Sequence, residues 1–280
     1  VHWCISCRTA LAEAEVEHEM HRSPAIYVEF PLKEESRSQF DELAPFFTGK
    51  SVSVLIWTTT PWTIPSNLAV AFHPELTYGV YDSKTETGDS SALILAKDLA
   101  SRVEQETGHV LGEPLATCQG RDLESLRFHH PLYERDSLAV LADYVTIEQG
   151  TGAVHTAPGH GTDDFNTGTR YGLEVYAPVG PDGKFAANVE LFAGLRVFDS
   201  NPKVEEALIA RKRLWHRSNL DHSYPHCWRC HNPVIFLATS QWFVAMDTKD
   251  FRKRALNAIS EVEWFPSWGE ERIHTMVANR

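Results

Sequence analysis

Two short segments concentrate the side chains with which a protein could bind and hydrolyse a polar substrate. Residues 150–165 read GTGAVHTAPGHGTDDF and hold His155, His160 and the adjacent Asp163 and Asp164 among several glycines. Residues 57–67 read WTTTPWTIPSN and place three consecutive threonine hydroxyls directly after an apolar run. Imidazole, carboxylate and hydroxyl groups bind polar ligands and transfer protons, and proteins often present them on loops held by a rigid scaffold. The two segments together predict a pocket.

The elements that must position these segments can be read from periodicity and from turn residues. Strands are predicted at 51–57 and 152–156, each leading into one of the two loops, and a helix is predicted from Asp163 to Tyr171. Residues 78–81 and 92–95 read as paired strands, and residues 96–107 as a helix that ends at Gly108. A further helix is predicted with Pro202 in its first turn, running to about Leu214. Many short strands with a few helices predict an α+β fold.

The two segments resemble the threonine-rich and GHGxDD signatures of one family, the editing domain of isoleucyl-tRNA synthetase. This domain is the connective insertion of a class I aminoacyl-tRNA synthetase. The form VHTAPGHG favours the isoleucyl branch over the valyl one. The resemblance extends to VHWCISCRTALAEAEVE, YPHCWRCHNPVIF, QWFVAMD and WGEERIHTMVANR, while residues 66–149 match loosely.

The resemblance implies a β-barrel editing core with peripheral helices and a small CxxC-containing stalk. Residues 1–44 and 215–280 would form the stalk, and residues 45–214 the editing domain. The chain has no HIGH-like or KMSKS-like peptide and no glycine-rich phosphate loop, so we expect no ATP-dependent aminoacylation. We expect an insertion taken from a longer synthetase.

Composition limits the partners and the compartment. A net charge of −12 opposes general nucleic-acid binding, because phosphate contacts need clustered Lys and Arg, although the acceptor end of a tRNA could still enter a pocket. The basic run 211–213 could touch phosphates or form a solvated helix face. No signal peptide and no membrane-spanning stretch is recognisable, so a cytoplasmic protein without a membrane partner is expected.

The five cysteines form two CxxC pairs, with Cys118 left over. The pairs are Cys4/Cys7 and Cys227/Cys230. In a reducing compartment such pairs indicate metal ligands or a redox centre, and four thiolates can hold a structural zinc ion. The long gap between the pairs is moderate evidence, which the resemblance strengthens. A structural Zn²⁺ is therefore favoured over a metal-free cluster, although family members of both kinds are implied, and no metal is expected for catalysis. Because the pairs lie far along the chain from both pocket motifs, we expect loss of a cysteine to loosen the stalk and leave the pocket chemistry largely intact.

The resemblance also implies the role of each pocket residue. Asp164 would hold the α-ammonium of an aminoacyl ester, and Asp163 would cap the following helix. His155 would line the amino-acid pocket and reject isoleucine by bulk, with a role as base as the minor option. The hydroxyls and N–H groups of the threonines would meet the ester and the adenosine. The expected catalytic set is Asp164, Thr59, Thr60 and His155, and the expected substrate-binding set is Thr58, Trp62, His160, Gly159 and Gly161.

The implied reaction is hydrolysis of valyl-tRNA(Ile) by a positioned water, assisted by the free ribose hydroxyl. A pocket gains only about 1–3 kcal/mol from one methylene, a known limit for isoleucine against valine in this family, so a second, smaller pocket must supply the remaining fidelity. The implied partners are the acceptor end of mischarged tRNA(Ile), valine and the rest of the synthetase chain. Two other readings remain open: a metal-dependent hydrolase built on His155, His160 and Asp164, and a non-catalytic tRNA-binding or structural appendage.

Overall fold

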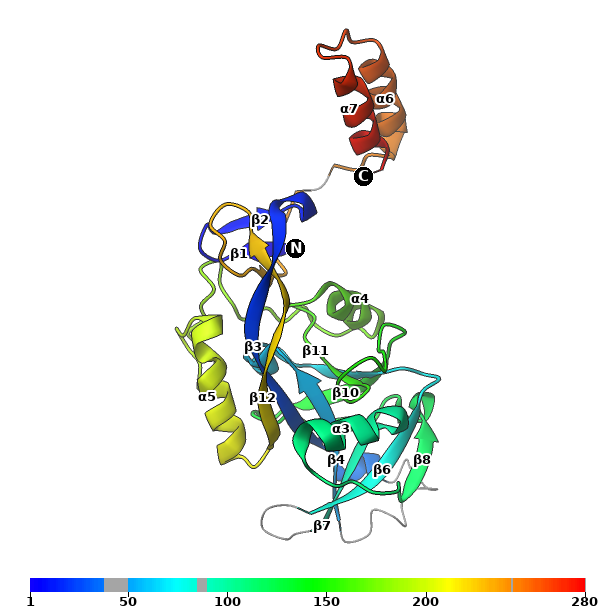
Figure 1. Ribbon diagram of the computed structural model, residues 1–280, viewed down its shortest axis with the longest axis vertical. Helices are drawn as coiled ribbons and strands as arrows, with labels where there is room; N and C mark the ends of the chain where they lie inside the picture. Colours follow the sequence, from blue (N-terminus) through cyan, green and yellow to red (C-terminus); the bar gives the residue numbers. More distant parts are fainter. Residues whose placement is uncertain (38–49, 85–89, 243, 280) are drawn as a thin grey trace. The chain divides into compact units, whose positions relative to one another are not determined.

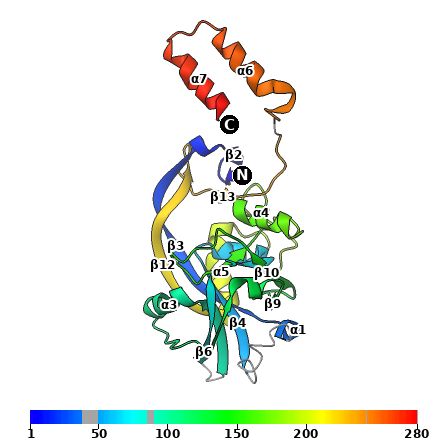
Figure 2. The same cartoon turned by 90° about the vertical axis from the view of Figure 1, so that its right-hand side faces the viewer.

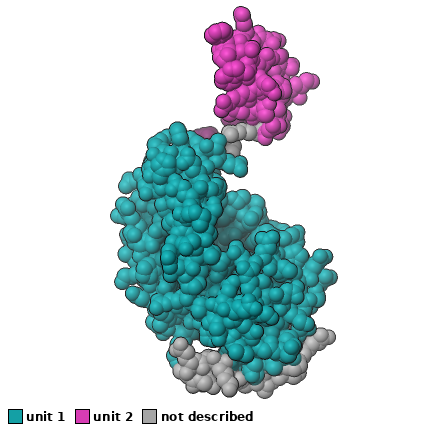
Figure 3. All heavy atoms as spheres, viewed as in Figure 1, with its two compact units in different colours: residues 1–238 teal, residues 239–280 magenta. Residues whose placement is uncertain are grey.

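The computed structural model describes residues 1–37, 50–84, 90–242 and 244–279. The chain divides into two compact units, Val1–Ala238 and Thr239–Arg280, which Figure 3 draws in different colours. All motifs of the predicted pocket and all five cysteines belong to the first unit. The predicted boundary between residues 44 and 45 lies outside the described residues, and the proposed division into stalk and editing segments stays a prediction.

The largest sheet has six strands in the order β12-β3-β4-β7-β6-β8. The strands β3 (Val16–Pro31) and β12 (Leu214–Cys227) pair antiparallel over almost their whole length, and Figure 1 shows them as a long twisted ribbon. The inner strands are β4 (Ser51–Thr58) and β7 (Ser90–Ala96), which pair parallel, followed by β6 (Thr77–Lys84) and β8 (Ala116–Gln119). Tyr78 pairs with Ala96 and Tyr81 with Leu93, which confirms the predicted pairing of 78–81 with 92–95.

The second sheet has four strands in the order β11-β5-β10-β9. Its strands are β5 (Ala69–Phe72), β9 (Arg127–His129), β10 (Asp136–Leu141) and β11 (Ala153–Thr156). The sequence analysis did not foresee β5, although every one of its residues is buried. This strand is parallel to β10 and antiparallel to β11, and it therefore holds the strand of the GHG motif in place.

The predicted α+β class is confirmed, but the strands described do not close into a barrel. The two sheets bury side chains in one hydrophobic core, and an isolated bridge between Leu32, just after β3, and Phe128 of β9 links them. That core contains, among others, Ile56 of the first sheet and Phe72 of the second. The strand β11 packs against β4, so the two pocket strands meet at the contact between the sheets.

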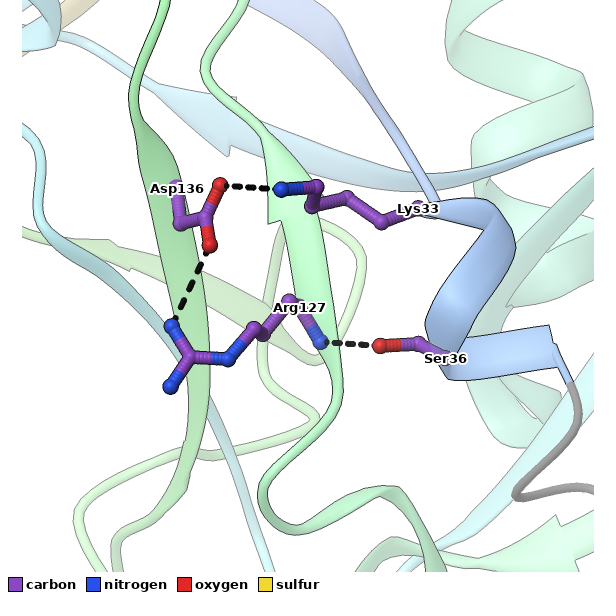
Figure 4. Close-up of polar contacts among 4 residues, drawn as sticks. All are labelled: Lys33, Ser36, Arg127 and Asp136. Carbon is purple, nitrogen blue, oxygen red and sulfur yellow. Dashed lines mark hydrogen bonds and ion pairs between the residues drawn. The ribbon is translucent and has the colours of Figure 1, made fainter.

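A group of polar side chains ties the segment after β3 to the second sheet (Figure 4). Asp136 on β10 accepts from Lys33 Nζ at 2.8 Å and from Arg127 Nη1 at 3.2 Å. The backbone N–H of Arg127 donates to Ser36 Oγ at 2.9 Å, where Ser36 belongs to α1 (Glu34–Arg37). The ion pairs are partly exposed, so each contributes at most about 1 kcal/mol. They tether the segment that follows β3 to the strands β9 and β10.

Three helices of the first unit test the predicted boundaries. The short η3 (Lys97–Leu99) leads into α3 (Ala100–Thr107), and Gly108 at φ 76° ends it, as predicted. The helix α4 (Thr162–Arg170) follows the GHG loop, within one residue of its predicted bounds. The helix α5 spans Val197–Ala210, so the prediction that it starts near Pro202 and reaches Leu214 was wrong. Buried Val197 and Ser200 anchor an earlier start, and Leu214 already belongs to β12.

A small sheet in the order β13-β1-β2 carries the CxxC segments. Its strands are β1 (His2–Cys4), β2 (Thr9–Leu11) and β13 (Ile235–Phe236), and short 3₁₀ turns lie at η1 (Glu13–Glu15) and η4 (Gly120–Leu123). The second unit contains η5 (Thr248–Asp250), α6 (Phe251–Ser260) and α7 (Trp268–Ala278), visible as two helices in Figure 2. Within the described residues, no helix is long and apolar enough to cross a membrane.

Candidate active site

The two chemically rich segments lie side by side. The strand β4 ends at Thr58 and leads through Thr59 and Thr60 into η2 (Pro61–Ser66), which returns the chain to β5. Antiparallel pairing of β5 with β11 then sets His155 opposite Val70. The N–H of Leu68 donates to the carbonyl of Thr156 at 3.0 Å. The threonine loop and the GHG loop therefore emerge together, as the sequence predicted.

His155 is buried and held on both sides by the threonine loop. The side-chain amide of Asn67 donates from Nδ2 to the carbonyl of Ala69 at 2.7 Å, which fixes its orientation, and the same Nδ2 lies 3.1 Å from His155 Nδ1. His155 Nδ1 must therefore accept, and the ring proton sits on Nε2. This Nε2–H donates to Thr63 Oγ1 at 2.7 Å, and Thr63 Oγ1 donates to the carbonyl of Thr60 at 2.8 Å.

This network leaves His155 neutral. Burial and, to a smaller extent, the neighbouring His160 together lower the pKa of His155 to about 3. Both ring nitrogens are already used in hydrogen bonds to Thr63 and Asn67. The His155 side chain is therefore held in one orientation and is uncharged at neutral pH. Neither Thr63 nor Asn67 was named as a site residue from the sequence, although both belong to the quoted WTTTPWTIPSN segment.

The three threonines form a tight polar turn at the end of β4. The N–H of Thr60 donates to Thr58 Oγ1 at 3.1 Å, and the hydroxyls of Thr58 and Thr60 also lie 3.1 Å apart. Thr58 is buried, whereas Thr59 and Thr60 are half-buried. The turn therefore locks the Thr58 hydroxyl and leaves Thr59 and Thr60 as its more accessible members.

Asp164 lies in the first turn of α4 and folds back over the GHG loop. Its Oδ2 accepts from the N–H of Ala157 at 2.8 Å. A Cβ on Gly161 would lie 2.8 Å from the Asp164 carboxyl carbon, so a glycine is needed there to admit this conformation. Burial and, to a smaller extent, the negative charge of Asp163 raise the pKa of Asp164 to about 6, in opposition to the hydrogen bond from Ala157. Within the described residues, no cationic side chain lies within ion-pair distance of Asp164.

Asp163 does not cap α4 as predicted. The N-cap residue is Gly161, two positions earlier, and it makes no side-chain cap hydrogen bond. Asp163 is exposed in the first turn, where its charge interacts with the helix dipole instead, worth typically about 0.3–1 kcal/mol.

The loop residues Gly159 and His160 connect the pocket to the small CxxC sheet. His160 Nδ1–H donates to the carbonyl of Phe236 on β13 at 3.1 Å, and the N–H of Ala238 donates to the carbonyl of Gly159 at 2.9 Å. A Cβ on Gly159 would lie 2.3 Å from the carbonyl oxygen of Tyr176, so the close backbone packing requires glycine. The CxxC sheet and the pocket, expected to be distant, are thus in direct contact.

Trp62 packs against the GHG loop from the other motif. Its ring meets that of His160 edge-on, with centroids 5.1 Å apart, and only 2% of the residue is exposed. Its backbone N–H donates to Asn201 Oδ1 on α5 at 3.0 Å. Trp62 therefore lies at the contact between the two motifs, held by α5.

Tyr144 is a neighbour of the pocket that the sequence analysis missed. Its hydroxyl is buried beside the side chains of Thr156 and Thr167. Burial raises the pKa of Tyr144, and the negative charge of Asp164 raises it further. No motif contains this residue, so only the packing of the second sheet against α4 reveals it.

A separate cavity of about 500 Å³ adjoins η2. Its wall residue His130 donates from Nε2 to the carbonyl of Ile64 at 2.9 Å. Arg211 and Arg213 of the basic run 211–213 contribute to its lining. The cavity is lined by His129, His130, Pro131, Leu132, Tyr133, Glu134, Glu190, Arg211 and Arg213. Two glutamates offset the two arginines, so the cavity has no strong net charge.

The four paired cysteines converge at the end of the β3–β12 ribbon. One sulfur atom from each of Cys4, Cys7, Cys227 and Cys230 lies within 4.8 Å of all the others, and Cys4 Sγ is 3.5 Å from Cys230 Sγ. Both CxxC turns end in a left-handed residue, Arg8 at φ 53° and His231 at φ 54°, so the two turns match in conformation. Four sulfurs around Zn²⁺ at about 2.3 Å would lie about 3.8 Å apart, which fits this set.

The alternative metal-hydrolase reading lacks this geometry. Among the described residues, His155, His160 and Asp164 do not form a group whose ligand atoms lie within 4.8 Å of one another, whereas the four cysteines do. His155 also has no free ring nitrogen for a metal.

Comparison with known proteins places these features in a family. Residues 1–280 match the family described as tRNA synthetases class I (I, L, M and V). The chain is 49% identical over 281 residues to the isoleucine–tRNA ligase of Nitratidesulfovibrio vulgaris Miyazaki F, and 48% identical over 280 residues to that of Syntrophotalea carbinolica. Each match covers 100% of this chain and 29% of the relative, so the chain spans less than a third of the length of these relatives.

Solved structures share the fold at much lower identity. The P. knowlesi cytosolic leucyl-tRNA synthetase editing domain matches with a TM-score of 0.55 at 11% identity, over 76% of this chain and 100% of that chain. A P. falciparum cytosolic leucyl-tRNA synthetase editing domain gives 0.54 at 10% identity, over 70% and 99%. The fold is therefore that of an editing domain.

Proposed function

The chain belongs to the class I tRNA synthetase family, and from this membership we propose that it hydrolyses the ester of mischarged valyl-tRNA(Ile). The products would be valine and free tRNA. Support comes from the 49% sequence identity to an isoleucine–tRNA ligase over the whole of this chain and from a fold shared with editing domains. The proposal goes beyond these similarities in naming the substrate and the bond that is cleaved.

One observation carries the proposal: Asp164 is a half-buried carboxylate that contacts the GHG loop and, within the described residues, has no cationic partner. Asp164 has its pKa raised to about 6, chiefly by burial, and ends at the GHG loop. A substrate α-ammonium would supply the missing positive charge, and a charge-assisted hydrogen bond is about twice as strong as a neutral one. The carboxylate thus selects an aminoacyl ester with a free amino group.

The remaining residues would divide size selection from catalysis. His155, neutral and fixed by Thr63 and Asn67, would exclude isoleucine by bulk. With its pKa lowered to about 3, it is a poor general base at neutral pH. A water positioned by Thr59 and Thr60 would attack the ester carbonyl, loop N–H groups would stabilise the oxyanion, and the free ribose hydroxyl would assist. Thr58, Trp62, His160, Gly159 and Gly161 would shape the site around the terminal adenosine.

We also propose that Cys4, Cys7, Cys227 and Cys230 hold a structural zinc ion. Burial raises the pKa of Cys4 to about 12, so these crowded thiols do not all ionise without a bound cation. The ion would supply only cross-linking of the two CxxC turns. In the longer protein, residues 1–44 and 215–280 would form the stalk and residues 45–214 the editing domain, acting in the cytoplasm with the remaining synthetase chain.

The decisive experiment compares hydrolysis of valyl-tRNA(Ile) and isoleucyl-tRNA(Ile) by this chain. We expect hydrolysis of the valyl ester, little of the isoleucyl ester, and loss of activity in Asp164→Asn, which keeps the acceptor for the Ala157 N–H. Persistence of activity with a chelator would oppose the metal-hydrolase alternative. A folded chain that binds tRNA but hydrolyses neither ester would favour the non-catalytic appendage.

A further inference from the structure

Two buried polar atoms on neighbouring rings of the candidate site have no partner. Within the described residues, Trp62 Nε1 and His160 Nε2 make no hydrogen bond. The two residues are only 2% and 8% exposed, and their rings meet edge-on with centroids 5.1 Å apart. A buried donor or acceptor left unsatisfied is costly, and native proteins satisfy most such groups with protein, water or ligand. This pair therefore marks a place where water or a polar ligand group could complete the hydrogen bonding.

The hydrogen-bonding roles of the two atoms are opposite. His160 Nδ1 donates to the carbonyl of Phe236, so Nε2 carries no proton and can only accept. Burial lowers the pKa of His160 to about 4, so the ring remains a neutral acceptor at physiological pH. The indole Nε1–H of Trp62 can only donate. An occupant that contacts both must donate one hydrogen bond and accept another.

The rings of Trp62 and His160 are both held in place by contacts with other elements of the fold. Phe236 belongs to β13, where it pairs with His2 of β1, and their rings lie 4.4 Å apart. The bond from Ala238 to Gly159 fixes the loop on the other side of His160. Trp62 is tethered by Asn201 of α5. The donor and the acceptor are thus preorganised before any ligand arrives, which lowers the entropy cost of binding.

We propose that Trp62 Nε1–H and His160 Nε2 form a subsite for a hydroxyl group, and that its occupant is the free vicinal hydroxyl of the terminal ribose. The inference rests on the proposed function. A hydroxyl both donates and accepts, whereas the α-ammonium only donates and is claimed by Asp164. The side chain of valine has no polar group. His160 is then a substrate-positioning residue whose tautomer is set by the stalk strand β13.

The test is a double-mutant cycle in which one change is made on the substrate. His160→Asn retains an amide that can donate to the Phe236 carbonyl but removes the Nε2 acceptor. It is compared with the parent on valyl-tRNA(Ile) that ends in ribose and on the same ester that lacks the vicinal hydroxyl. In the parent, loss of that hydroxyl should reduce kcat/KM. In His160→Asn the same loss should have an effect about tenfold smaller, because the hydrogen bond from the hydroxyl to Nε2 is already absent. An equal reduction in both proteins would overturn the subsite.

Matched variants separate this role from a structural one. Trp62→Phe keeps the ring and removes the N–H, and it should show the same non-additivity. His160→Gln places an amide near the Nε2 position and should recover part of the rate lost in His160→Asn. His129→Asn, at an exposed histidine on β9, should behave as the parent. A rate loss in His160→Asn that merely follows a lower melting temperature would count against the proposal.

A binding measurement keeps this inference distinct from the proposed function. An amide-linked valyl-adenosine resists hydrolysis, so calorimetry can compare it with its analogue that lacks the vicinal hydroxyl. The parent should bind the hydroxyl form about tenfold more tightly, and His160→Asn should bind the two alike. Equal affinity in the parent would overturn the subsite alone. A preserved preference without hydrolysis of valyl-tRNA(Ile) would overturn the proposed function alone, and no binding of either compound would overturn both.

Discussion

The pocket and the cysteine cluster of this chain are assembled in opposite ways. The candidate site combines two local motifs, residues 57–67 and 150–165, which the pairing of β5 with β11 brings together. The cluster combines residues more than 200 positions apart, joined by the β3–β12 ribbon. The pocket also keeps polar atoms unpaired on Trp62 and His160, whereas the four sulfurs of the cluster face one another.

This difference distinguishes a ligand-binding site from a structural metal site. Unpaired buried groups lower stability and persist where a ligand completes them, while a closed thiolate set contributes to stability directly. The contact of Phe236 and Ala238 with the GHG loop joins the two regions. A substitution in one region can therefore affect the other through these two contacts.

The largest expected effect is on the pocket alone. Asp164→Ala should reduce hydrolysis of valyl-tRNA(Ile) at least about 100-fold, because an unpaired ammonium in a closed site costs several kcal/mol and each 1.4 kcal/mol is about a tenfold rate loss. The measurement is kcat/KM at matched folding. Asp163→Ala is the control, since that exposed residue should change stability by less than about 1 kcal/mol and leave the rate unchanged. Equal rates for the parent and Asp164→Ala would show that Asp164 does not pair with the substrate ammonium.

Next in size is the effect of breaking the cluster. Cys227→Ser should lower the free energy of unfolding by about 2–4 kcal/mol, because Cys227 is fully buried among the other three sulfurs. Thermal melting and zinc content of the purified protein give the measurement. Hydrolysis should fall less than about tenfold, through the Phe236 contact with His160. Absence of zinc together with unchanged melting would contradict the structural site.

His155→Ala should change the discrimination between the valyl and isoleucyl esters more than the rate of hydrolysis of the valyl ester. The substitution opens space for one more methylene, worth about 1–3 kcal/mol, so hydrolysis of isoleucyl-tRNA(Ile) should rise about tenfold relative to the valyl ester. Little else is lost, because Thr63 still donates to the Thr60 carbonyl and Asn67 to that of Ala69. Unchanged discrimination would show that His155 is not the size filter.

The pH dependence of stability tests the raised pKa of Asp164. With the folded pKa raised from 3.8 to about 6, chiefly by burial, this group stabilises the fold fully only below about pH 3.8, and the contribution disappears as pH rises through about 6. Asp164→Asn should therefore be more stable than the parent at pH 8, by about 1–2 kcal/mol after solvent screening, and the gain should shrink toward pH 4. Urea unfolding at both pH values measures it. A gain independent of pH would contradict the assignment.

The smallest expected effect concerns the network around His155. Thr63→Val removes the acceptor of the Nε2–H and should cost about 1–2 kcal/mol of stability, since the group left behind is buried. Chemical unfolding gives the free energy, and ring nitrogen shifts report whether the tautomer of His155 persists. The matched control is Thr169→Val on the exposed face of α4, which should cost less.

Much of the site could be predicted because its motifs are local. Thr58 to Thr60, His155 and Asp164 stand in two continuous segments, and each segment includes the end of a strand that the sequence predicted. The β6–β7 pairing and the cap at Gly108 were confirmed for the same reason. The missed features depend on partners distant in the chain. The strand β5 is four residues long, Tyr144 lies in no motif, and α5 begins five residues before Pro202 because buried Val197 anchors its start.

The sequence by itself determined the family, the α+β class and the residue types of the pocket, because these are carried by local order and composition. Tertiary structure decided the states of those residues. The tautomer of His155 follows from Asn67 and Thr63, and the bare Nε2 of His160 follows from a carbonyl 76 residues away on β13. The open sheets also replaced the expected barrel. Hydrogen-bond partners and burial across the fold set protonation and access, and no stretch of sequence contains both members of such a pair.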